Sequence, residues 1–316
     1  LIKEFSFIGS SSLIGQLISL LTVILITKSM GAVDYGKLTI VFAPIMALPI
    51  LFNFGVPNAV FRFYNTTQDL VKRECVVSTA FFFVLIVTAM VGFVLLNISS
   101  FFHLPSYFEK LTELILGIIA VISLSNVLSV ILRADREYKV ISYVNVINPT
   151  VKLILIGSVV SFDNLSFKAV LVAHLFSEFV VLAILVAKAP RIGIKRFSIV
   201  TLKQLVTYGI AFVPHRLFAR SARPLFHIVI ARIIGVEYTG YFSFAEKLVL
   251  PLTFLIDKIQ FIWEPIKFEL HDSVEKEKSF TDIILAMFYI LLILSGSYGI
   301  LILFFPISIF PDYDES

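Results

Sequence analysis

The sequence uses one short pattern twice, in "SMGAVDYGKLTI" (Ser29–Ile40) and in "IIGVEYTGYFSFAEKL" (Ile233–Leu248). Each stretch has a glycine, then a tyrosine and a second glycine, and a new apolar run follows. Glycine gives a tight turn the backbone freedom that it needs, and tyrosine suits the headgroup layer of a membrane. The pattern therefore predicts two equivalent hairpins between membrane-spanning helices.

The composition is that of a polytopic membrane protein. The 316 residues are 58% hydrophobic and 15% charged, and the mean hydropathy is +0.96. Soluble domains carry about 25% charged residues. The single cysteine, Cys75, excludes an internal disulfide and provides no cysteine cluster for a metal.

Apolar segments long enough to span a membrane, roughly 20 residues each, recur along the whole chain. We interpret the first as a retained span, because no small-residue cleavage site follows a short apolar core. The predicted spans are Phe5–Thr27, Leu38–Val60, Val76–Leu96, Leu111–Leu132, Ile141–Ser161, Phe167–Ala187, Leu205–Ile234, Tyr241–Trp263 and Asp282–Phe305.

The loop charges predict a cytoplasmic N-terminus and an outer C-terminus. With that orientation, most of the 26 Lys and Arg residues lie in cytoplasmic segments, as the positive-inside rule requires. The longest basic loop, "KAPRIGIKRFSIVTLKQ", separates the sixth span from the seventh. We therefore predict an N-lobe of six transmembrane helices (1–190), a basic cytoplasmic linker (191–204) and a partial C-lobe of three transmembrane helices (205–316).

The two glycine-tyrosine hairpins join spans one and two, and spans seven and eight. The pattern thus restarts after six spans, on the side predicted to be outer. An even-numbered offset makes the two repeats parallel, related by an axis along the membrane normal.

One region also resembles a known family. "GAVDYGKLTIVFAPIMALPILFNFGVPNAVFRFYN" (31–65) is similar to the N-terminal region of Wzx-type polysaccharide or O-antigen flippases. These flippases belong to the multidrug/oligosaccharidyl-lipid/polysaccharide exporter (MOP) superfamily. The second turn and the "YFSFAEKL" after it resemble the second half of that family. The residues that carry the likeness are Gly31, Asp34, Tyr35, Gly36, "FGVPNA" (Phe54–Ala59), "RFY" (Arg62–Tyr64), Gly235, Glu237, Tyr238 and Gly240.

The resemblance implies an all-α polytopic membrane protein with a MATE-like two-lobe transporter fold. The N-lobe would be complete, with six helices, and about three helices of the C-lobe would be present. Because members of the family have twelve or more spans, we expect the chain to be C-terminally truncated.

The resemblance also implies a function. It is the transport of an undecaprenyl-diphosphate-linked oligosaccharide, a repeat unit of O-antigen, capsule or exopolysaccharide, from the cytoplasmic to the outer leaflet by alternating access. The implied location is the bacterial inner (cytoplasmic) membrane. The implied partners are the lipid-linked glycan, the bilayer, a polysaccharide polymerase and glycosyltransferases.

The seventh span, "LVTYGIAFVPHRLFARSARPLFHIVIARIIG", carries the candidate binding residues Arg216, Arg220, Arg223 and His227 on one helical stripe. An arginine at mid-bilayer costs about 2.5–3.5 kcal/mol, so the stripe should face a polar interior. Arginine also binds phosphate through a two-pronged fork. We predict a cationic cavity for an anionic headgroup. Two alternatives remain, that Arg216 reaches the interface or that the arginines pair with acids such as Glu178.

Further polar residues lie inside predicted spans. Lys152 in span five belongs either to the cationic cavity or to the membrane interface. His174 and Glu178 lie four residues apart on one face of span six, as a coupling pair that takes up a proton or as structural partners. Small residues between Gly9 and Gly15 permit a close approach of another helix.

Other functions find less support in the sequence. It contains no Gly-rich phosphate loop and no His-Glu-x-x-His motif, so we expect no enzyme, cofactor or metal site. The scattered basic residues do not indicate nucleic-acid binding. The alternatives are a drug or cation exporter of the same superfamily, a membrane-embedded glycan or prenyl-phosphate transferase, and a fragment without activity.

Overall fold

The computed structural model describes residues 2–67, 69–98, 111–162, 165–189 and 192–249, and part of 285–300. All regular elements in these ranges are helices. The chain forms two compact units, Leu1–Gly240 and Tyr241–Ser316. Much of predicted spans eight and nine lies outside the described residues. In the second unit, the Tyr298 hydroxyl donates a hydrogen bond to the backbone oxygen of Leu248.

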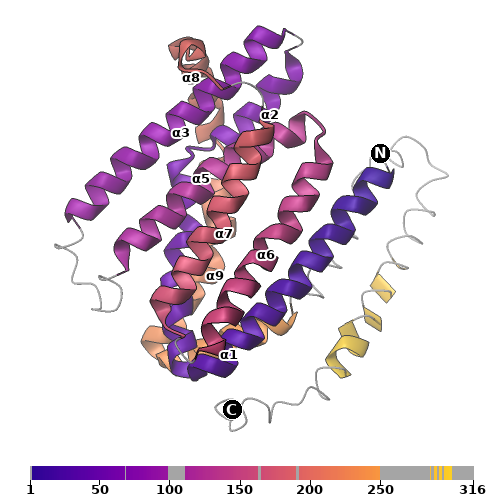
Figure 1. Cartoon of the computed structure of the whole chain (residues 1–316), viewed down its shortest axis with the longest axis vertical. Coiled ribbons are helices and arrows are strands. Elements are labelled where there is room, and N and C mark those ends of the chain that lie inside the picture. Colours follow the sequence, from indigo (N-terminus) through magenta and orange to yellow (C-terminus); the bar gives the residue numbers. More distant parts are fainter. Residues whose placement is uncertain are drawn as a thin grey trace. The chain divides into compact units, whose positions relative to one another are not determined.

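The first unit is a bundle of helices, and most of them run roughly alongside one another (Figure 1). α1 packs chiefly against α6, α5 against α7, and α8 against α2. The elements are α1 (Ile2–Phe52), α2 (Val56–Thr66), α3 (Leu70–Ile98), α5 (Thr112–Ala134), α6 (Tyr138–Ser161), α7 (Phe167–Lys188), η2 (Ile194–Arg196), α8 (Ile199–Ile210) and α9 (Val213–Ile233).

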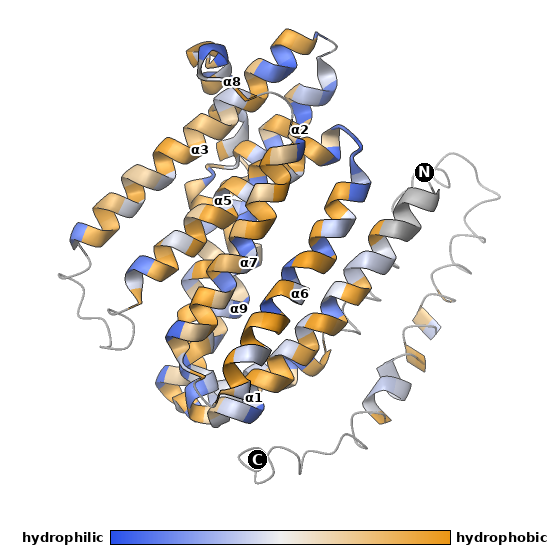
Figure 2. Cartoon of the chain, viewed as in Figure 1, coloured by the Kyte–Doolittle hydropathy of each residue, from blue (hydrophilic) through white to orange (hydrophobic). Residues whose placement is uncertain are grey.

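The long helices are apolar over most of their length, as Figure 2 shows for α3, α5 and α7. Among the described residues, five helices are long and apolar enough to cross a membrane. The first of these, Ile8–Phe52, is 45 residues long and contains most of the first predicted span and most of the second. The other four are α3, α5, α6 and α7, which correspond to predicted spans three to six.

The first predicted hairpin is a sharp break inside α1. Gly31 has φ 72° and ψ 170°, whereas the residues on both sides are helical. That backbone conformation is accessible to glycine and strained for other residues. The connection between spans one and two is therefore shorter than the sequence indicates.

Two predicted spans are interrupted, which corrects their continuous assignment. Predicted span two, Leu38–Val60, stops being helical at Asn53–Gly55, and α2 begins after it. Predicted span seven, Leu205–Ile234, is divided at Ala211–Phe212 into α8 and α9. The physical reason is similar in both, because a proline in the first turn of α2 and of α9 favours the start of a new helix.

The buried core lies around α5. Ile118, Leu128 and Ile131 have no exposed surface, and apolar residues of α2, α3, α6, α7 and α8 complete the cluster around the C-terminal half of α5. Residues of α1 and α7 pack with the N-terminal half of α5. α5 thus packs against helices on several sides of the bundle.

The basic linker is attached to α3. Arg196 of η2 forms an ion pair with Glu74, and the Ser78 hydroxyl accepts a hydrogen bond from the Gly193 N–H at 3.1 Å. The Thr79 hydroxyl accepts another from the Ser198 N–H at 3.1 Å. The linker and the start of α8 are therefore held by a helix of the predicted N-lobe.

A second polar contact ties α2 to the turn after α5. The Tyr64 hydroxyl donates a hydrogen bond to Asp135 Oδ1 at 2.5 Å. Burial raises the pKa of Tyr64, and the bond to Asp135 raises it further. The hydroxyl thus stays protonated and can keep donating.

The two glycine turns meet each other. A Cβ atom at Gly36 would collide with the carbonyl oxygen of Val236, and a Cβ atom at Gly240 would collide with that of Ala32. The same offset separates Gly36 from Gly240 and Ala32 from Val236, so the contact is reciprocal. A two-fold axis between the turns, as predicted from the parallel repeats, produces a contact of this kind.

Candidate functional site

The predicted arginine stripe lies on α9. Arg216, Arg220 and Arg223 are exposed, and His227 is partly buried on the same helix. Pro224 lies within the helix and is buried. The three guanidinium groups are thus accessible to a ligand.

Arg133, at the last turn of α5, extends this cationic group. Its charge is close enough to those of Arg216 and Arg220 for them to repel one another. Its Nε donates a hydrogen bond to the Ser129 backbone oxygen at 3.3 Å. Within the part of the chain that the structure describes, no acidic side chain forms an ion pair with any of these three arginines.

Sequence reasoning did not include Arg133 in the predicted cationic cavity. Arg133 lies near α9 because of how α5 packs in the bundle. The spacing of residues within one segment of the sequence does not predict packing between helices. We call Arg133, Arg216 and Arg220 the arginine cluster.

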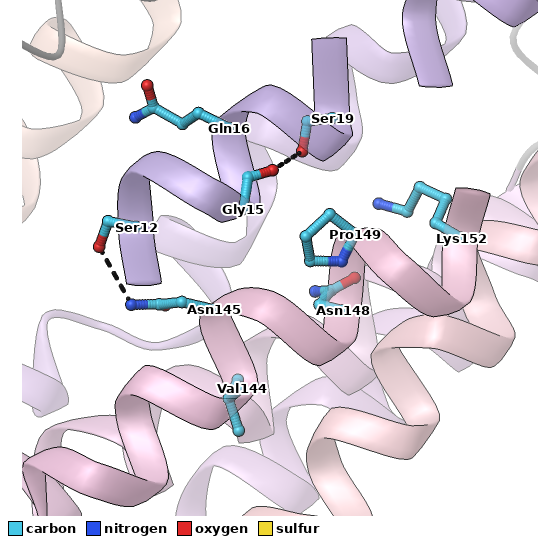
Figure 3. A pocket seen from close by; sticks show the side chains of 9 residues that line it. All are labelled: Ser12, Gly15, Gln16, Ser19, Val144, Asn145, Asn148, Pro149 and Lys152. Atoms are coloured by element: carbon cyan, nitrogen blue, oxygen red, sulfur yellow. Dashed lines mark hydrogen bonds between the residues drawn. The ribbon is translucent and has the colours of Figure 1, made fainter. Parts of the chain in front are cut away.

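Lys152 lies in a separate place, a pocket of about 370 Å³ between α1 and α6 (Figure 3). The walls are mostly polar: the hydroxyl groups come from α1, the ammonium group from α6 and the amides from both helices. The lining residues are Ser12, Gly15, Gln16, Ser19, Val144, Asn145, Asn148, Pro149 and Lys152.

Small residues of α1 make the close packing around this pocket possible. A Cβ atom at Gly15 would collide with the backbone oxygen of Asn145, so only glycine fits there. Asn145 Nδ2 donates a hydrogen bond to Ser12 Oγ at 3.2 Å, which links the two helices (Figure 3). The predicted close approach at the small residues of span one is confirmed.

His174 and Glu178 lie on α7 behind the pocket. Glu178 is buried, and its Oε1 accepts a hydrogen bond from Asn148 Nδ2 at 2.9 Å. The His174 ring meets Phe42 edge-on, with ring centres 5.1 Å apart. The structure therefore places Glu178 against the Asn148 side chain, with His174 on the same helix.

The predicted alternative of a Glu178–arginine pair has no counterpart among the described residues, where Asn148 is the partner of Glu178. The sequence prediction did not include Asn148, Asn145 or Gln16 as pocket residues. Their positions on α1 and α6 become meaningful only when the two helices are placed side by side.

Comparison with known proteins identifies the family. Residues 1–260 match the family described as polysaccharide biosynthesis protein. The chain belongs to this family. The resemblance to Wzx-type flippases of the MOP superfamily is thereby confirmed. The comparison with curated proteins finds no match.

Solved structures of MOP superfamily transporters share the fold of this polysaccharide biosynthesis protein. An inward-facing multidrug resistance MATE family transporter has a TM-score of 0.64 at 16% identity, covering 90% of this chain and 69% of that chain. An outward-facing MATE family transporter has a TM-score of 0.60 at 16% identity, covering 80% and 62%. A MOP superfamily transporter from Pyrococcus furiosus, described as having a binding pocket of reversed polarity, has a TM-score of 0.53 at 14% identity, covering 87% and 75%.

The family and the fold together define the protein broadly. It is an all-α, multi-pass membrane protein with the fold of MATE transporters. The family places it in polysaccharide biosynthesis.

Proposed function

We propose that the protein moves an undecaprenyl-diphosphate-linked oligosaccharide from the cytoplasmic to the outer leaflet of the bacterial inner membrane. The observation that carries the proposal is the arginine cluster, in a member of a polysaccharide biosynthesis family that has a transporter fold. Arg223 and His227 continue the stripe along α9 and extend the cationic surface.

The arginine cluster suits a diphosphate headgroup. Like charges held together repel one another, and an anion bound among them relieves that repulsion. Guanidinium groups bind phosphate oxygens through paired hydrogen bonds, which are stronger than bonds between neutral groups. A diphosphate offers enough oxygens to engage more than one arginine at once.

The proposed transport follows alternating access, in which two lobes expose a shared cavity first to one side of the membrane and then to the other. The N-terminus is cytoplasmic in this proposal, which places the α5 end with Arg133 on the side where the glycan is assembled. Glycosyltransferases would supply the substrate and a polysaccharide polymerase would consume it. Glu178, which is buried, and His174, which is partly buried on the same helix, are the candidate coupling groups.

Complementation tests the proposal. The gene that encodes this chain is expressed in a bacterium that lacks its own lipid-linked glycan flippase, and surface polysaccharide is measured. We expect Arg220→Ala to lower export at least about tenfold relative to its protein level, because a hydrogen bond to a charged group is lost. Arg220→Lys should retain part of the activity, since it keeps the charge and loses the fork.

The matched control is Arg232→Ala, which removes an exposed arginine in the last turn of the same helix. It lies away from the stripe and should leave export unchanged. Arg220→Ala export at the wild-type level would contradict the proposal, and an equal loss of export and protein would assign Arg220 a structural role.

Export of a cationic drug fits the site less well. A positively charged substrate would be repelled by Arg133, Arg216 and Arg220, and acidic residues would be expected in their place. The multidrug transporters among the structural relatives share the fold at 16% identity, which does not extend to their substrates.

A further inference from the structure

The two interrupted spans break at the same point of the bundle. Predicted span two stops being helical at Asn53–Gly55, where Phe54 and Gly55 have positive φ angles of 47° and 67°. Predicted span seven is divided at Ala211–Phe212. A Cβ atom at Gly55 would collide with the Gly209 carbonyl oxygen, and one at Gly209 would lie 2.8 Å from the Phe54 oxygen. The backbones of the two breaks therefore touch, with no side chain between them.

α8, which precedes the second break, is anchored to the predicted N-lobe. Leu205 has no exposed surface and belongs to the core cluster around α5. The Arg62 guanidinium of α2 lies 4.5 Å from the centre of the Tyr208 ring, and the Phe63 ring meets the same ring at 5.8 Å. The hydrogen bonds between the linker and α3 hold the start of α8. α8 is therefore attached to α2, α3 and α5.

α9, which follows the break, is held more loosely. Of its residues Val213–Ile233, all of which the structure describes, only Pro224 and Ile230 are buried. It packs chiefly against α1, and not against the cluster that holds α8. The charges of Arg216 and Arg220 on α9 also repel Arg133 of α5. The two halves of predicted span seven thus differ in how firmly they are attached.

The connection between α8 and α9 lacks a helical hydrogen bond. Pro214 has no N–H, so the Ile210 carbonyl has no donor four residues further along the chain. The Phe212 N–H bonds to the Gly209 oxygen, three residues back, at 3.0 Å. Sharp bends in helices occur at prolines for this reason. α9 can therefore change its direction relative to α8 without breaking a regular helical ladder.

We propose that α9 pivots at Ala211–Phe212 against Gly55, while α8 stays with the predicted N-lobe. Interlocked side chains resist such a turn, and at this contact there are none to repack. The boundary between the moving parts then lies inside predicted span seven and not in the basic linker (191–204). The pivot changes the distance of Arg216 and Arg220 from Arg133. That this motion is a step of glycan transport rests on the proposed function.

Distances between spin labels test the pivot without a substrate. Phe179→Cys on α7 carries the reference label, and the second label is at Phe218→Cys on α9 or at Val200→Cys on α8. All three positions are exposed. The full chain is used, with Cys75→Ser to remove the native thiol. Pulsed electron paramagnetic resonance in lipid nanodiscs measures the α7–α9 and the α7–α8 distance.

Reversal of one charge supplies the driving force. Arg133→Glu turns the repulsion of Arg216 and Arg220 into attraction, so the α7–α9 distance should change by several ångströms. The α7–α8 distance should stay the same, because α8 does not follow. Lys139→Glu is the matched control, since it makes the same change of charge at an exposed position in the first turn of α6 and should leave both distances unchanged.

Two further measurements locate the bend and guard against a variant that does not fold. Pro214→Ala supplies the missing N–H, so it should make the change caused by Arg133→Glu smaller. Sodium chloride screens the repulsion in a protein that keeps Arg133. Raising its concentration should therefore also change the α7–α9 distance and leave the α7–α8 distance as it is.

Three outcomes would overturn the proposal. Equal changes of both distances would mean that α8 and α9 move as one body. An α7–α9 distance that responds to neither Arg133→Glu nor salt would mean that α9 does not pivot. A change of full size in Pro214→Ala would place the bend elsewhere.

The pivot and the proposed function fail separately, because the distances are measured without a glycan. A pivot together with full export by Arg220→Ala would refute the proposed function alone. A rigid α9 together with lost export by Arg220→Ala would refute the pivot alone.

Discussion

The two glycine turns, 31–36 and 235–240, have similar backbones and different side chains. Each begins with a glycine of positive φ, 72° at Gly31 and 140° at Gly235. Each ends with a buried glycine that lies against a carbonyl oxygen of the other turn. Two polar contacts of the side chains, one in each turn, differ in kind.

The first turn has an ion pair, in which Lys37 Nζ lies 2.8 Å from Asp34 Oδ1. The position equivalent to Asp34 is Tyr238 in the second turn. There the buried Thr239 hydroxyl donates to the Gly235 oxygen at 3.2 Å, or to the His227 oxygen at 3.4 Å.

The difference separates what the contact requires from what it allows. A reciprocal contact requires the same absence of a side chain on both sides, because each glycine meets the backbone of the other turn. It places no such requirement on side chains that point elsewhere. The glycines are therefore repeated, and the polar residues follow their local surroundings.

The largest expected effect comes from the paired glycines. Gly36→Ala and Gly240→Ala should each lower the free energy of unfolding by about 1–3 kcal/mol, because the added Cβ meets backbone that must move. The double variant should lose less unfolding free energy than the sum of the two single losses, because the first substitution already separates the turns. Thermal unfolding of the purified protein in detergent measures all three.

Gly92→Ala is the matched control for these variants. A Cβ atom at Gly92 of α3 would meet nothing within 4 Å, so alanine should be neutral or stabilise the helix by about 0.5–1 kcal/mol. A Gly36→Ala variant as stable as Gly92→Ala would disprove the close contact of the turns.

The same comparison indicates how far sequence reasoning reaches. The glycine turns could be found from the sequence because their backbone conformation and close contact require glycine, and a repeated glycine pattern is visible in the sequence. The apolar helices α3, α5, α6 and α7 could be found because long apolar runs are necessary in a membrane. Hydropathy does not respond to a change of backbone direction, so the break at Asn53–Gly55 inside an apolar run was missed.

The candidate binding residues divide in the same way. The stripe on α9 could be predicted because its members share one helix, and helical spacing alone places them on one face. Arg133 lies on α5, and the Asn148–Glu178 bond joins α6 to α7, so both depend on packing between helices. The sequence shows the residue types that form these contacts but not which residues pair with each other.

An intermediate effect is expected for the buried Thr239 hydroxyl of the second turn. Thr239→Val keeps the shape and removes the hydroxyl bond, which should lower the free energy of unfolding by about 0.5–1.5 kcal/mol. Thr39→Val is the comparison in the first repeat, where a partly buried hydroxyl bonds to the Tyr35 oxygen at 3.0 Å. Thermal unfolding should show the smaller loss for Thr39→Val, and the opposite order would mean that burial does not decide the difference.

The smallest effect is expected for the ion pair of the first turn. The side chains of Lys37 and Asp34 are 33% and 45% exposed, so water screens their attraction. Asp34→Asn should lower the free energy of unfolding by less than about 1 kcal/mol, and the difference should shrink as salt is added. Unfolding midpoints of the wild type and Asp34→Asn at low and high salt measure this. A salt-independent loss as large as that of Gly36→Ala would show that Asp34 holds the turn in shape, and the two turns would then differ in how they are stabilised and not only in their side chains.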